Sequence, residues 1–391
     1  MQRKTYAIID GNKIKENVKE IKKHYPDYKY YIGVVKNNAY HHGIKCVTSM
    51  IEGGVNYFAV SSLEEAISLR NYTDFPILIL EPIALDLVLD AINLNLTITV
   101  DSLDYAKKLV DVDLFAKLKV HLAVDSGMNR LGIKDAKELK ETYSLLLAND
   151  KINLEGLYTH FATSGIMDPY YDKQLKTFKS ITSSISLKDI PIVHLGRSLT
   201  LVTREKLDFV NGIRLGIIMY GLSLSSNLGG GLKGKLRELK RTLIRKKYKC
   251  SACHFTNNLK LKTAFSLYSS VMAIRRVYKG DNVGYNTYKV KNDGYIITIP
   301  IGYADGVTKD FKYVSYKVKK LPIVSDSSDM LMAFSEEYIN IDEKIEIFGA
   351  SISVLEAARN LHVNTYHLFN QIQNRVLRIH KNGDELEEIF Y

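Results

Sequence analysis

The chain has 391 residues, of which 46% are hydrophobic and 25% are charged, as in an ordinary globular protein with a full core. This length allows two domains, or one large barrel with an appended domain. No apolar run approaches the roughly 20 residues of a membrane-spanning helix, and the four apolar residues near the amino terminus are too few for a secretion signal. Three cysteines predict a reducing compartment, so we expect a cytoplasmic protein without disulfides.

The net charge of +11 is concentrated in one segment. Eight of these net charges lie between Leu232 and Lys249, where leucines recur at helical spacing. This pattern favours a solvated helix with one apolar stripe, and a basic helix that binds a membrane surface or nucleic acid is the alternative. Because the rest of the chain is nearly balanced in charge, we expect no nucleic-acid partner.

From the amino end, short β-rich runs alternate with helical patterns. Strands are predicted at residues 30–35, 56–60, 76–80, 97–100, 119–124, 153–158, 191–194 and about 208–213. Helical patterns such as Ser62–Arg70 and Ala136–Leu147 lie between them. Eight such repeats predict a closed parallel (β/α)8 TIM barrel over 1–224. An open doubly wound sheet is the alternative, but no glycine-rich fingerprint follows the first strand.

The pattern changes after Tyr220. Three glycines at 229–231 break the chain, and we expect a basic insert or linker over 225–262, with no assigned role for 228–258. Alternating runs with Asn, Asp and Gly turns then predict a mostly antiparallel β-domain over 263–391. Its clearest elements are strands at 269–274, 294–301 and 344–348 and a helix at 353–361.

The segment Cys250–His254 has the Cys-x-x-Cys-His spacing of a c-type haem site. We expect neither haem nor metal there. Haem attachment needs export, and a zinc site needs a second pair of ligands, whereas the only other cysteine is Cys46.

The active site of a TIM barrel lies at the carboxyl ends of its strands. Lys36 ends the first strand, where partial burial would lower its pKa and favour a nucleophile, although a lysine whose head reaches water is the alternative. Later strand ends contribute Tyr40, Arg130, His160, Ser198 and Arg214. Taken singly, each has a structural explanation such as a loop charge or a helix cap. Together they suit an anionic, aldehyde-bearing cofactor and a carboxylate substrate.

Seven motifs lie in order across nearly the whole chain. They are Val-Val-Lys-Asn-Asn-Ala-Tyr-His-His-Gly (34–43), Asp-Ser-Gly-Met-Asn-Arg-Leu-Gly (125–132), Glu-Gly-Leu-Tyr-Thr-His-Phe-Ala (155–162), Arg-Leu-Gly-Ile-Ile-Met-Tyr-Gly (214–221), Thr-Ala-Phe-Ser-Leu (263–267), Val-Gly-Tyr-Asn-Thr-Tyr (283–288) and Ile-Pro-Ile-Gly-Tyr-Ala-Asp-Gly (299–306). In these motifs the chain resembles the alanine racemases, a family of fold type III enzymes that use pyridoxal 5'-phosphate. Their fold is a (β/α)8 barrel followed by a β-domain.

The resemblance implies four catalytic residues. Lys36 would carry the cofactor on its side-chain nitrogen and act as a base on one face of the substrate Cα. Tyr285 of the partner subunit in a homodimer would be the base on the other face, because inversion needs a proton removed on one side and returned on the other. Arg214 would hydrogen-bond the pyridine nitrogen, and His160 would orient Arg214. Decarboxylases of this fold have a carboxylate at that place, so Arg214 favours a racemase.

Further contacts follow from the same resemblance. The cofactor phosphate would be bound by Tyr40, Ser198 and the backbone N–H groups of Gly216 and Ile217. Arg130 would face the substrate carboxylate or the cofactor's phenolic oxygen. The substrate would also meet the backbone N–H of Ser328, and Tyr303 would stand at its entrance. The implied activity is interconversion of L-alanine and D-alanine, which supplies D-alanine for peptidoglycan.

Four places depart from the family pattern. Asn374 stands where a tyrosine is usual, Arg197 replaces an asparagine, and Ala123 replaces a lysine that is often carbamylated. The Gly-Arg-x-Cys-Met-Asp-Gln block is replaced by residues 325–330. These changes leave the preferred amino acid and the turnover rate open. A racemase of serine or another small amino acid, or a catalytically weakened relative that binds the cofactor, remains an alternative.

Overall fold

The computed structural model describes residues 4–163, 169–222, 239, 243, 259–285, 287–383 and 385–389. The chain forms two compact units, here called the sheet unit (Met1–Ile14, Asn37–Cys46 and Lys262–Tyr391) and the barrel unit (Lys15–Lys36 and Val47–Leu261). Both units are discontinuous in sequence, whereas the expected domains 1–224 and 263–391 are continuous. The expected insert 225–262, the basic helix and the Cys250–His254 segment lie outside the described residues, apart from Leu239, Leu243 and 259–262. Among the described helices, none is both long and apolar enough to span a bilayer.

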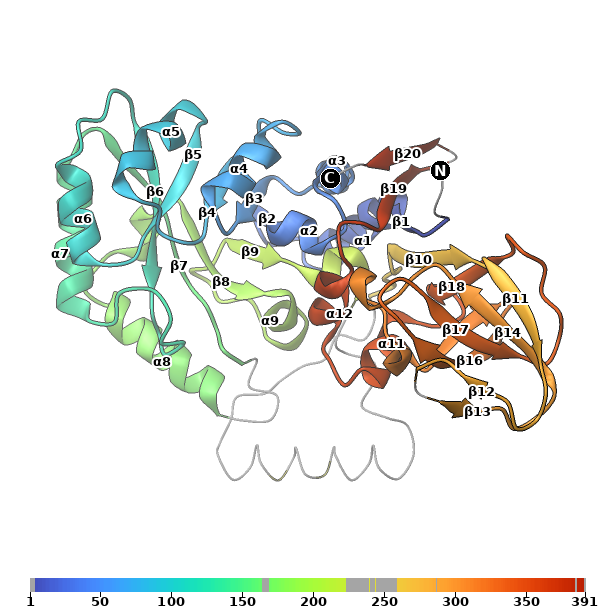
Figure 1. Cartoon of the computed structure of the whole chain (residues 1–391). Helices are drawn as coiled ribbons and strands as arrows, with labels where there is room; N and C mark the ends of the chain where they lie inside the picture. Colours follow the sequence, from blue (N-terminus) through green and yellow to red (C-terminus); the bar gives the residue numbers. More distant parts are fainter. Residues whose placement is uncertain are drawn as a thin grey trace. The chain divides into compact units, whose positions relative to one another are not determined.

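Eight parallel strands close into a ring in the barrel unit (Figure 1). They are β2 (Tyr30–Val34), β3 (Tyr57–Val60), β4 (Ile77–Ile79), β5 (Leu96–Val100), β6 (Leu118–Val124), β7 (Ile152–Thr159), β8 (Ile192–Arg197) and β9 (Gly212–Leu215). The first strand, β2, pairs with both β3 and β9, and this pairing closes the barrel. The predicted (β/α)8 barrel is therefore confirmed, and the open-sheet alternative is wrong.

Helices follow or precede these strands, and Figure 1 shows several of them around the ring. They are α1 (Gly11–His24), α3 (Val47–Gly53), α4 (Leu63–Arg70), α5 (Val88–Asn93), α6 (Leu103–Val110), α7 (Ala136–Ala148), α8 (Tyr170–Thr182) and α9 (Ser198–Thr203). Local caps fix where two of the predicted helices begin. The Ser62 hydroxyl accepts a hydrogen bond from the Glu65 N–H before α4, and the Asp135 carboxylate accepts from two N–H groups before α7.

The eighth barrel strand lies later than predicted. We expected it at about 208–213, but β9 begins at Gly212. A turn in which the Val210 N–H donates to the Leu207 carbonyl at 2.9 Å delays the start of the strand. Arg214 therefore lies within a barrel strand instead of following one.

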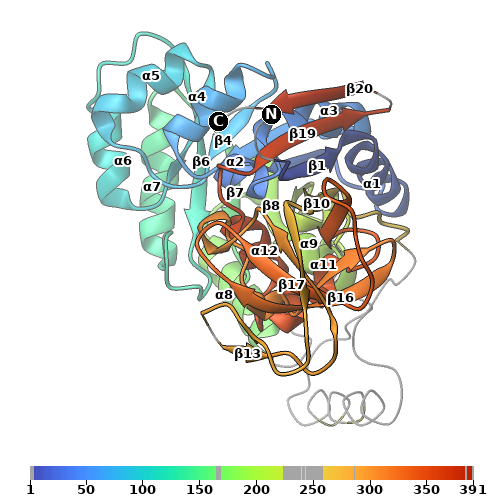
Figure 2. The same ribbon diagram turned by 45° about the vertical axis from the view of Figure 1, so that its right-hand side comes forward.

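Ten strands of the sheet unit form one sheet in the order β11-β14-β17-β16-β15-β18-β10-β1-β19-β20. They are β1 (Tyr6–Asp10), β10 (Phe265–Ser270), β11 (Ala273–Val277), β14 (Gly294–Ile299), β15 (Tyr313–Tyr316), β16 (Lys319–Asp326), β17 (Leu331–Ser335), β18 (Lys344–Phe348), β19 (Leu377–Asn382) and β20 (Glu385–Ile389). All neighbours are antiparallel except β1 and β19, which run side by side in Figure 2. The predicted mostly antiparallel β-domain is confirmed.

Two parts of this sheet differ from the sequence-based expectation. Strand β1 was not predicted, and it completes the sheet between β10 and β19. The single strand expected at 269–274 is wrong, because the chain makes two strands there, β10 and β11. The break occurs where Val271 and Met272 donate to the carbonyls of Glu343 and Thr298, which come from different parts of the sheet. A short hairpin of β12 (Asn282–Val283) and β13 (Tyr288–Lys289) and two helices, α11 (Val354–Asn360) and α12 (Thr365–Gln371), complete the unit.

A left-handed turn follows Lys36 directly. The short helix α2 (Lys36–Tyr40) is left-handed over Asn37 to His41, with φ between 50° and 62°. This conformation costs an L-residue roughly 1–2 kcal/mol, so surrounding contacts must hold it. In the sheet unit, His41 Nδ1 bonds the Ile372 carbonyl at 3.0 Å, and the buried Arg378 donates to the His41 carbonyl at 3.3 Å.

Candidate active site

Most of the predicted site residues lie at one end of the barrel. Lys36 follows β2, Arg130 lies in the loop after β6, His160 follows β7, Ser198 begins α9 after β8, and Arg214 lies near the end of β9. Gly216 and Ile217 come directly after β9. The strands of a closed parallel barrel all end at the same rim, so the barrel unit brings these residues together. Lys36 is half-buried there, and Arg130 is exposed.

Arg214 is held by the barrel in one orientation. Its Nη1 donates to Nδ1 of His194 at 2.6 Å and to the carbonyl of the same residue at 2.9 Å. Its Nη2 donates to the carbonyls of Thr159 at 2.7 Å and Leu195 at 3.2 Å, with Nδ1 of His160 at 3.5 Å. Among the described residues, Nε alone of the three guanidinium nitrogens has no hydrogen-bond partner. The protein therefore fixes the guanidinium group and leaves one N–H for a ligand.

The rim is strongly cationic. Burial, followed by the charges of Arg214, Arg197, Arg130 and Lys36, lowers the pKa of His160 to about 2, so this imidazole is neutral at ordinary pH. Burial also lowers the pKa of Arg214 to about 10, which still leaves it charged at neutral pH. Four cations around one barrel end favour an anionic ligand.

The first turns of two helices lie at this rim. Ser198 begins α9, and Ile217 begins a short 3₁₀ helix (Ile217–Tyr220). The Gly216 N–H donates to the Ser198 hydroxyl oxygen at 3.0 Å, which joins the ends of the adjacent strands β8 and β9. Backbone N–H groups and a hydroxyl at this place are the kind of donors that bind phosphate in barrels.

The loop that carries Arg130 has a defined shape. The buried carboxylate of Asp125 accepts the N–H of Gly127 at 2.8 Å and of Asn129 at 3.0 Å. Gly132 has φ +113°, and a Cβ there would lie 2.7 Å from the Asp125 nitrogen, so only glycine fits. Ala123 is buried at the position of the family's lysine, and its methyl group offers Arg130 no hydrogen bond.

Tyr303 and Ser328 are neighbours in the sheet unit. The N–H of the residue after Tyr303 donates to the Ser328 carbonyl at 2.9 Å, and the Tyr303 side chain is 58% exposed. Arg375 ties the same region together, with Nη2 2.7 Å from the Asp329 carboxylate and Nε 3.1 Å from that of Asp305. The altered segment 325–330, which begins in the last two residues of β16, is therefore structured.

Tyr285 projects from the hairpin between β12 and β13. Its side chain is 84% exposed, although tyrosine rings are usually partly buried. A Cβ on Gly284 would lie 2.1 Å from Ser325 Oγ, so the hairpin approaches the 325–330 loop closely. Tyr40 is buried in the same unit, where its ring packs edge-on against Tyr366 at 5.0 Å. Asn374 is exposed.

The polar residues inside the barrel were not predicted from the sequence. His121, Tyr158 and His194 are buried within β6, β7 and β8, and Glu155 lies near the start of β7. The available signal was a titratable side chain within an otherwise apolar strand, as in Lys-Val-His-Leu-Ala-Val. In the described residues, no group of three or more Cys, His, Asp or Glu side chains is arranged to hold a metal ion.

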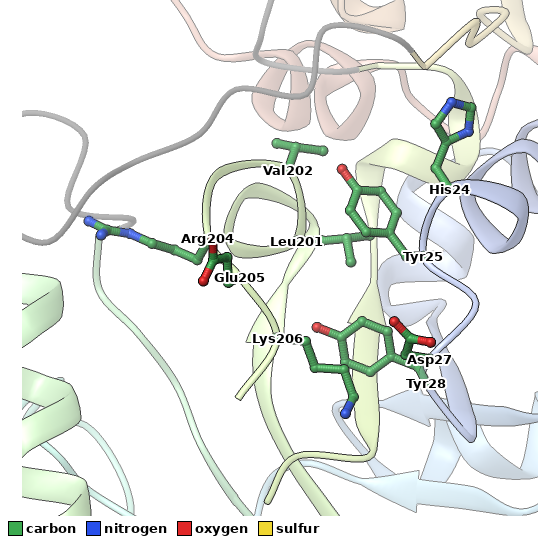
Figure 3. A pocket seen from close by; sticks show the side chains of 9 residues that line it. All are labelled: His24, Tyr25, Asp27, Tyr28, Leu201, Val202, Arg204, Glu205 and Lys206. Carbon is green, nitrogen blue, oxygen red and sulfur yellow. The ribbon is translucent and has the colours of Figure 1, made fainter. Parts of the chain in front are cut away.

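A separate hollow of about 300 Å³ lies where the chain enters β2 and β9 (Figure 3). Its lining comes from the end of α1 and the residues just after it, and from the end of α9 and beyond: His24, Tyr25, Asp27, Tyr28, Leu201, Val202, Arg204, Glu205 and Lys206. These segments lead into the amino ends of the two strands, whereas the candidate residues occupy the carboxyl ends. This hollow is therefore not part of the candidate site.

Comparison with known proteins agrees with this geometry. The family model for the alanine racemase N-terminal domain matches residues 9–224, and the model for the C-terminal domain matches residues 264–380. The chain belongs to the alanine racemase family. Alanine racemase 1 of Bacillus subtilis is 31% identical over 98% of this chain and 95% of its own length. The enzyme of Streptococcus gordonii is 33% identical over 98% of this chain and 99% of its own.

Solved structures of the family are also similar. The alanine racemase of Bacillus anthracis with bound L-Ala-P superposes with a TM-score of 0.85 at 31% identity, covering all of this chain and 98% of that one. A histidine racemase from Leuconostoc mesenteroides has a TM-score of 0.80 at 25% identity, with 97% and 98% of the two chains covered. The fold is thus shared by racemases of different amino acids.

Proposed function

We propose that this chain is a pyridoxal 5'-phosphate-dependent amino-acid racemase that interconverts L-alanine and D-alanine. The observation that carries the proposal is the fixed guanidinium of Arg214, with Nε left for a ligand at a cationic barrel end. The family membership supports the same function. A cytoplasmic location and a supply of D-alanine to peptidoglycan belong to this proposal, as does a chain order of a barrel domain over 1–224 and then a β-domain over 263–391, to whose sheet the first segment adds β1.

The residues at the barrel end fit the cofactor. Lys36 would hold it covalently, Arg214 Nε would donate to its ring nitrogen, and Ser198, Gly216 and Ile217 would bind its phosphate together with Tyr40. Bound pyridoxal phosphate withdraws electrons from the substrate Cα and makes its proton removable. Because an arginine does not give up its proton, Arg214 keeps the ring nitrogen unprotonated and limits that withdrawal. His160 is neutral, so its Nδ1 can accept from Arg214.

Two bases on opposite faces of Cα would then invert the substrate. Lys36 would act on one face, and Tyr285 of the partner subunit would act on the other. The 84% exposure of Tyr285 supports this role, because a tyrosine that serves a second chain must project from its own. The proposed assembly is therefore a homodimer with shared active sites.

The substrate contacts would be Arg130, the backbone N–H of Ser328, and Tyr303. Arg130 would attract the substrate carboxylate or the cofactor's phenolic oxygen, and Tyr303 would narrow the entrance. Since Ala123 and the 325–330 loop depart from the family pattern at this place, serine or another small amino acid is the second candidate substrate. The similar histidine racemase supports testing a wider panel.

The test is an assay of purified protein with a panel of L-amino acids. We expect bound pyridoxal phosphate to give a visible absorbance band and L-alanine to lose optical activity fastest. Lys36→Ala should lose both the band and the activity. Tyr285→Phe should keep the band and lose roughly 10²–10⁴-fold in rate, the usual contribution of a general acid or base. Tyr338→Phe is the control, because Tyr338 is also an exposed tyrosine, with 58% of its side chain exposed. A protein that binds no pyridoxal phosphate would refute the proposal.

A further inference from the structure

A line of polar side chains crosses the interior of the barrel from Arg214 toward the amino ends of the strands. Arg214 Nη1 lies 2.6 Å from Nδ1 of His194, and Nε2 of His194 lies 3.0 Å from Nδ1 of His121. His121 Nε2 faces the Glu155 carboxylate at 3.4 Å, longer than an ordinary hydrogen bond, and no other polar atom of the described residues bonds it. The hydroxyl of Tyr57 donates to the same carboxylate at 2.6 Å.

The chemistry of the two ends sets the direction of every proton along this line. A guanidinium group can only donate, so Nδ1 of His194 must accept, and its proton must be on Nε2. That Nε2–H then donates to Nδ1 of His121, which places the second proton on Nε2 as well. An ionised carboxylate can only accept, so Glu155 favours the same arrangement from the other end. Both imidazoles are thereby held as neutral Nε2–H tautomers.

The charges at the two ends are complementary. Both histidines are fully buried, and burial lowers the pKa of each, so neither carries charge at neutral pH. Burial alone would raise the pKa of Glu155, but the nearby His121 ring and the hydrogen bond from Tyr57 outweigh it and lower this pKa to about 2. The line therefore joins a buried cation to a carboxylate through two neutral rings.

We propose that Glu155, acting through His121 and His194, is a positioning residue for Arg214. The carboxylate reinforces, from the far end, the tautomer that the guanidinium group requires of both rings, and so helps to keep Nδ1 of His194 as the acceptor that aligns that group. The nearest general precedent is a buried carboxylate that holds one histidine in its working tautomer, where loss of the charge alone is costly. The importance of this line for catalysis rests on the function proposed above, whereas the tautomers themselves do not.

The test compares Glu155→Gln with Glu138→Gln. Each change removes one half-buried carboxylate that accepts a hydrogen bond, but Glu138 lies on α7 and accepts from the Leu103 N–H. Glutamine at 155 can present either an oxygen or an N–H group to His121, so the proton direction is no longer enforced from that end. We expect Glu155→Gln to lower kcat about tenfold and Glu138→Gln to change it less than twofold.

The direct readout is ¹⁵N NMR of protein labelled at histidine, without cofactor. The unmodified protein should show His121 and His194 as single Nε2–H tautomers, and Glu155→Gln should show mixed or shifted tautomers. Proton placement on Nδ1 of either ring in the unmodified protein would overturn the proposal, even if the variant did not fold. A loss of kcat with unchanged tautomers would also overturn it. Absence of racemase activity would refute the proposed function and leave the tautomer measurement as an independent test.

Discussion

The substitution Gly156→Ala tests the packing behind His121. Gly156 lies in β7, and a Cβ added there would be 2.5–2.7 Å from three atoms of the His121 ring. Ordinary contacts of this kind are about 3.5–4.0 Å, so the ring must move by about 1 Å. A shift of this size along the 3.0 Å hydrogen bond from His194 to His121 would lengthen it to about 4 Å, beyond hydrogen-bonding range.

The expected cost follows from these two effects. Forcing a methyl group into a packed interior costs about 1–3 kcal/mol, and the lost hydrogen bond adds about 1 kcal/mol. The free energy of unfolding should therefore fall by about 2–4 kcal/mol. For a unit of about 240 residues each kcal/mol shifts Tm by about 2–4 °C, so we expect Tm to fall by about 4–16 °C.

A double-mutant cycle with His121→Ala decides whether the ring is the cause. With the ring removed, Gly156→Ala meets open space and should cost less than about 1 kcal/mol. Thermal unfolding of the four proteins measures the coupling. An equal cost of Gly156→Ala in both backgrounds would show that the His121 ring is not what excludes a methyl group from this position.

Three further results are expected. The free energy of unfolding should fall as pH drops from 7 to 5.5. Burial lowers the pKa values of His121, His160 and His194 in the fold, to about 2 for His160, so the unfolded chain binds more protons below pH 6.5. Each of these histidines contributes at most about 1.4 kcal/mol of this loss per pH unit. In urea unfolding, the free energy of unfolding of His160→Asn should therefore depend less steeply on pH than that of the unmodified protein. Asp305→Asn should cost about 1–3 kcal/mol, since the buried carboxylate pairs with half-exposed Arg375, whereas Asp310→Asn on the surface should be neutral in the same assay. The Tyr285→Phe variant with bound cofactor should racemise its substrate more slowly than the unmodified protein. An unchanged rate would show that Tyr285 is not the second base.

Local sequence patterns were enough to predict the barrel. Most strands are apolar runs bounded by turn residues, and some of the helices begin at a side chain that caps them, as α4 and α7 do at Ser62 and Asp135. Such signals are local, so they do not depend on partners far away in the chain. The late start of β9 escaped prediction because the Leu207–Val210 turn carries apolar residues.

Long-range pairing decided what the sequence left open. Strand β1 has few residues and no hairpin partner, and it becomes a strand because β10 and β19, more than 250 residues away, provide its hydrogen bonds. The left-handed turn after Lys36 is unfavourable locally, and contacts with Ile372 and Arg378 hold it.

The residues of the candidate site also fall into those that the sequence predicted and those that only the tertiary structure brought together. Motifs in the sequence were enough to predict Lys36, Arg214 and Tyr285 as site residues, because such motifs depend only on residue type and on neighbours in the chain. Only the closed barrel placed His194, His121 and Glu155 in line behind Arg214, since they come from three different strands whose register is a tertiary property. The sequence determines which groups are available, and the barrel determines which of them can act on one another.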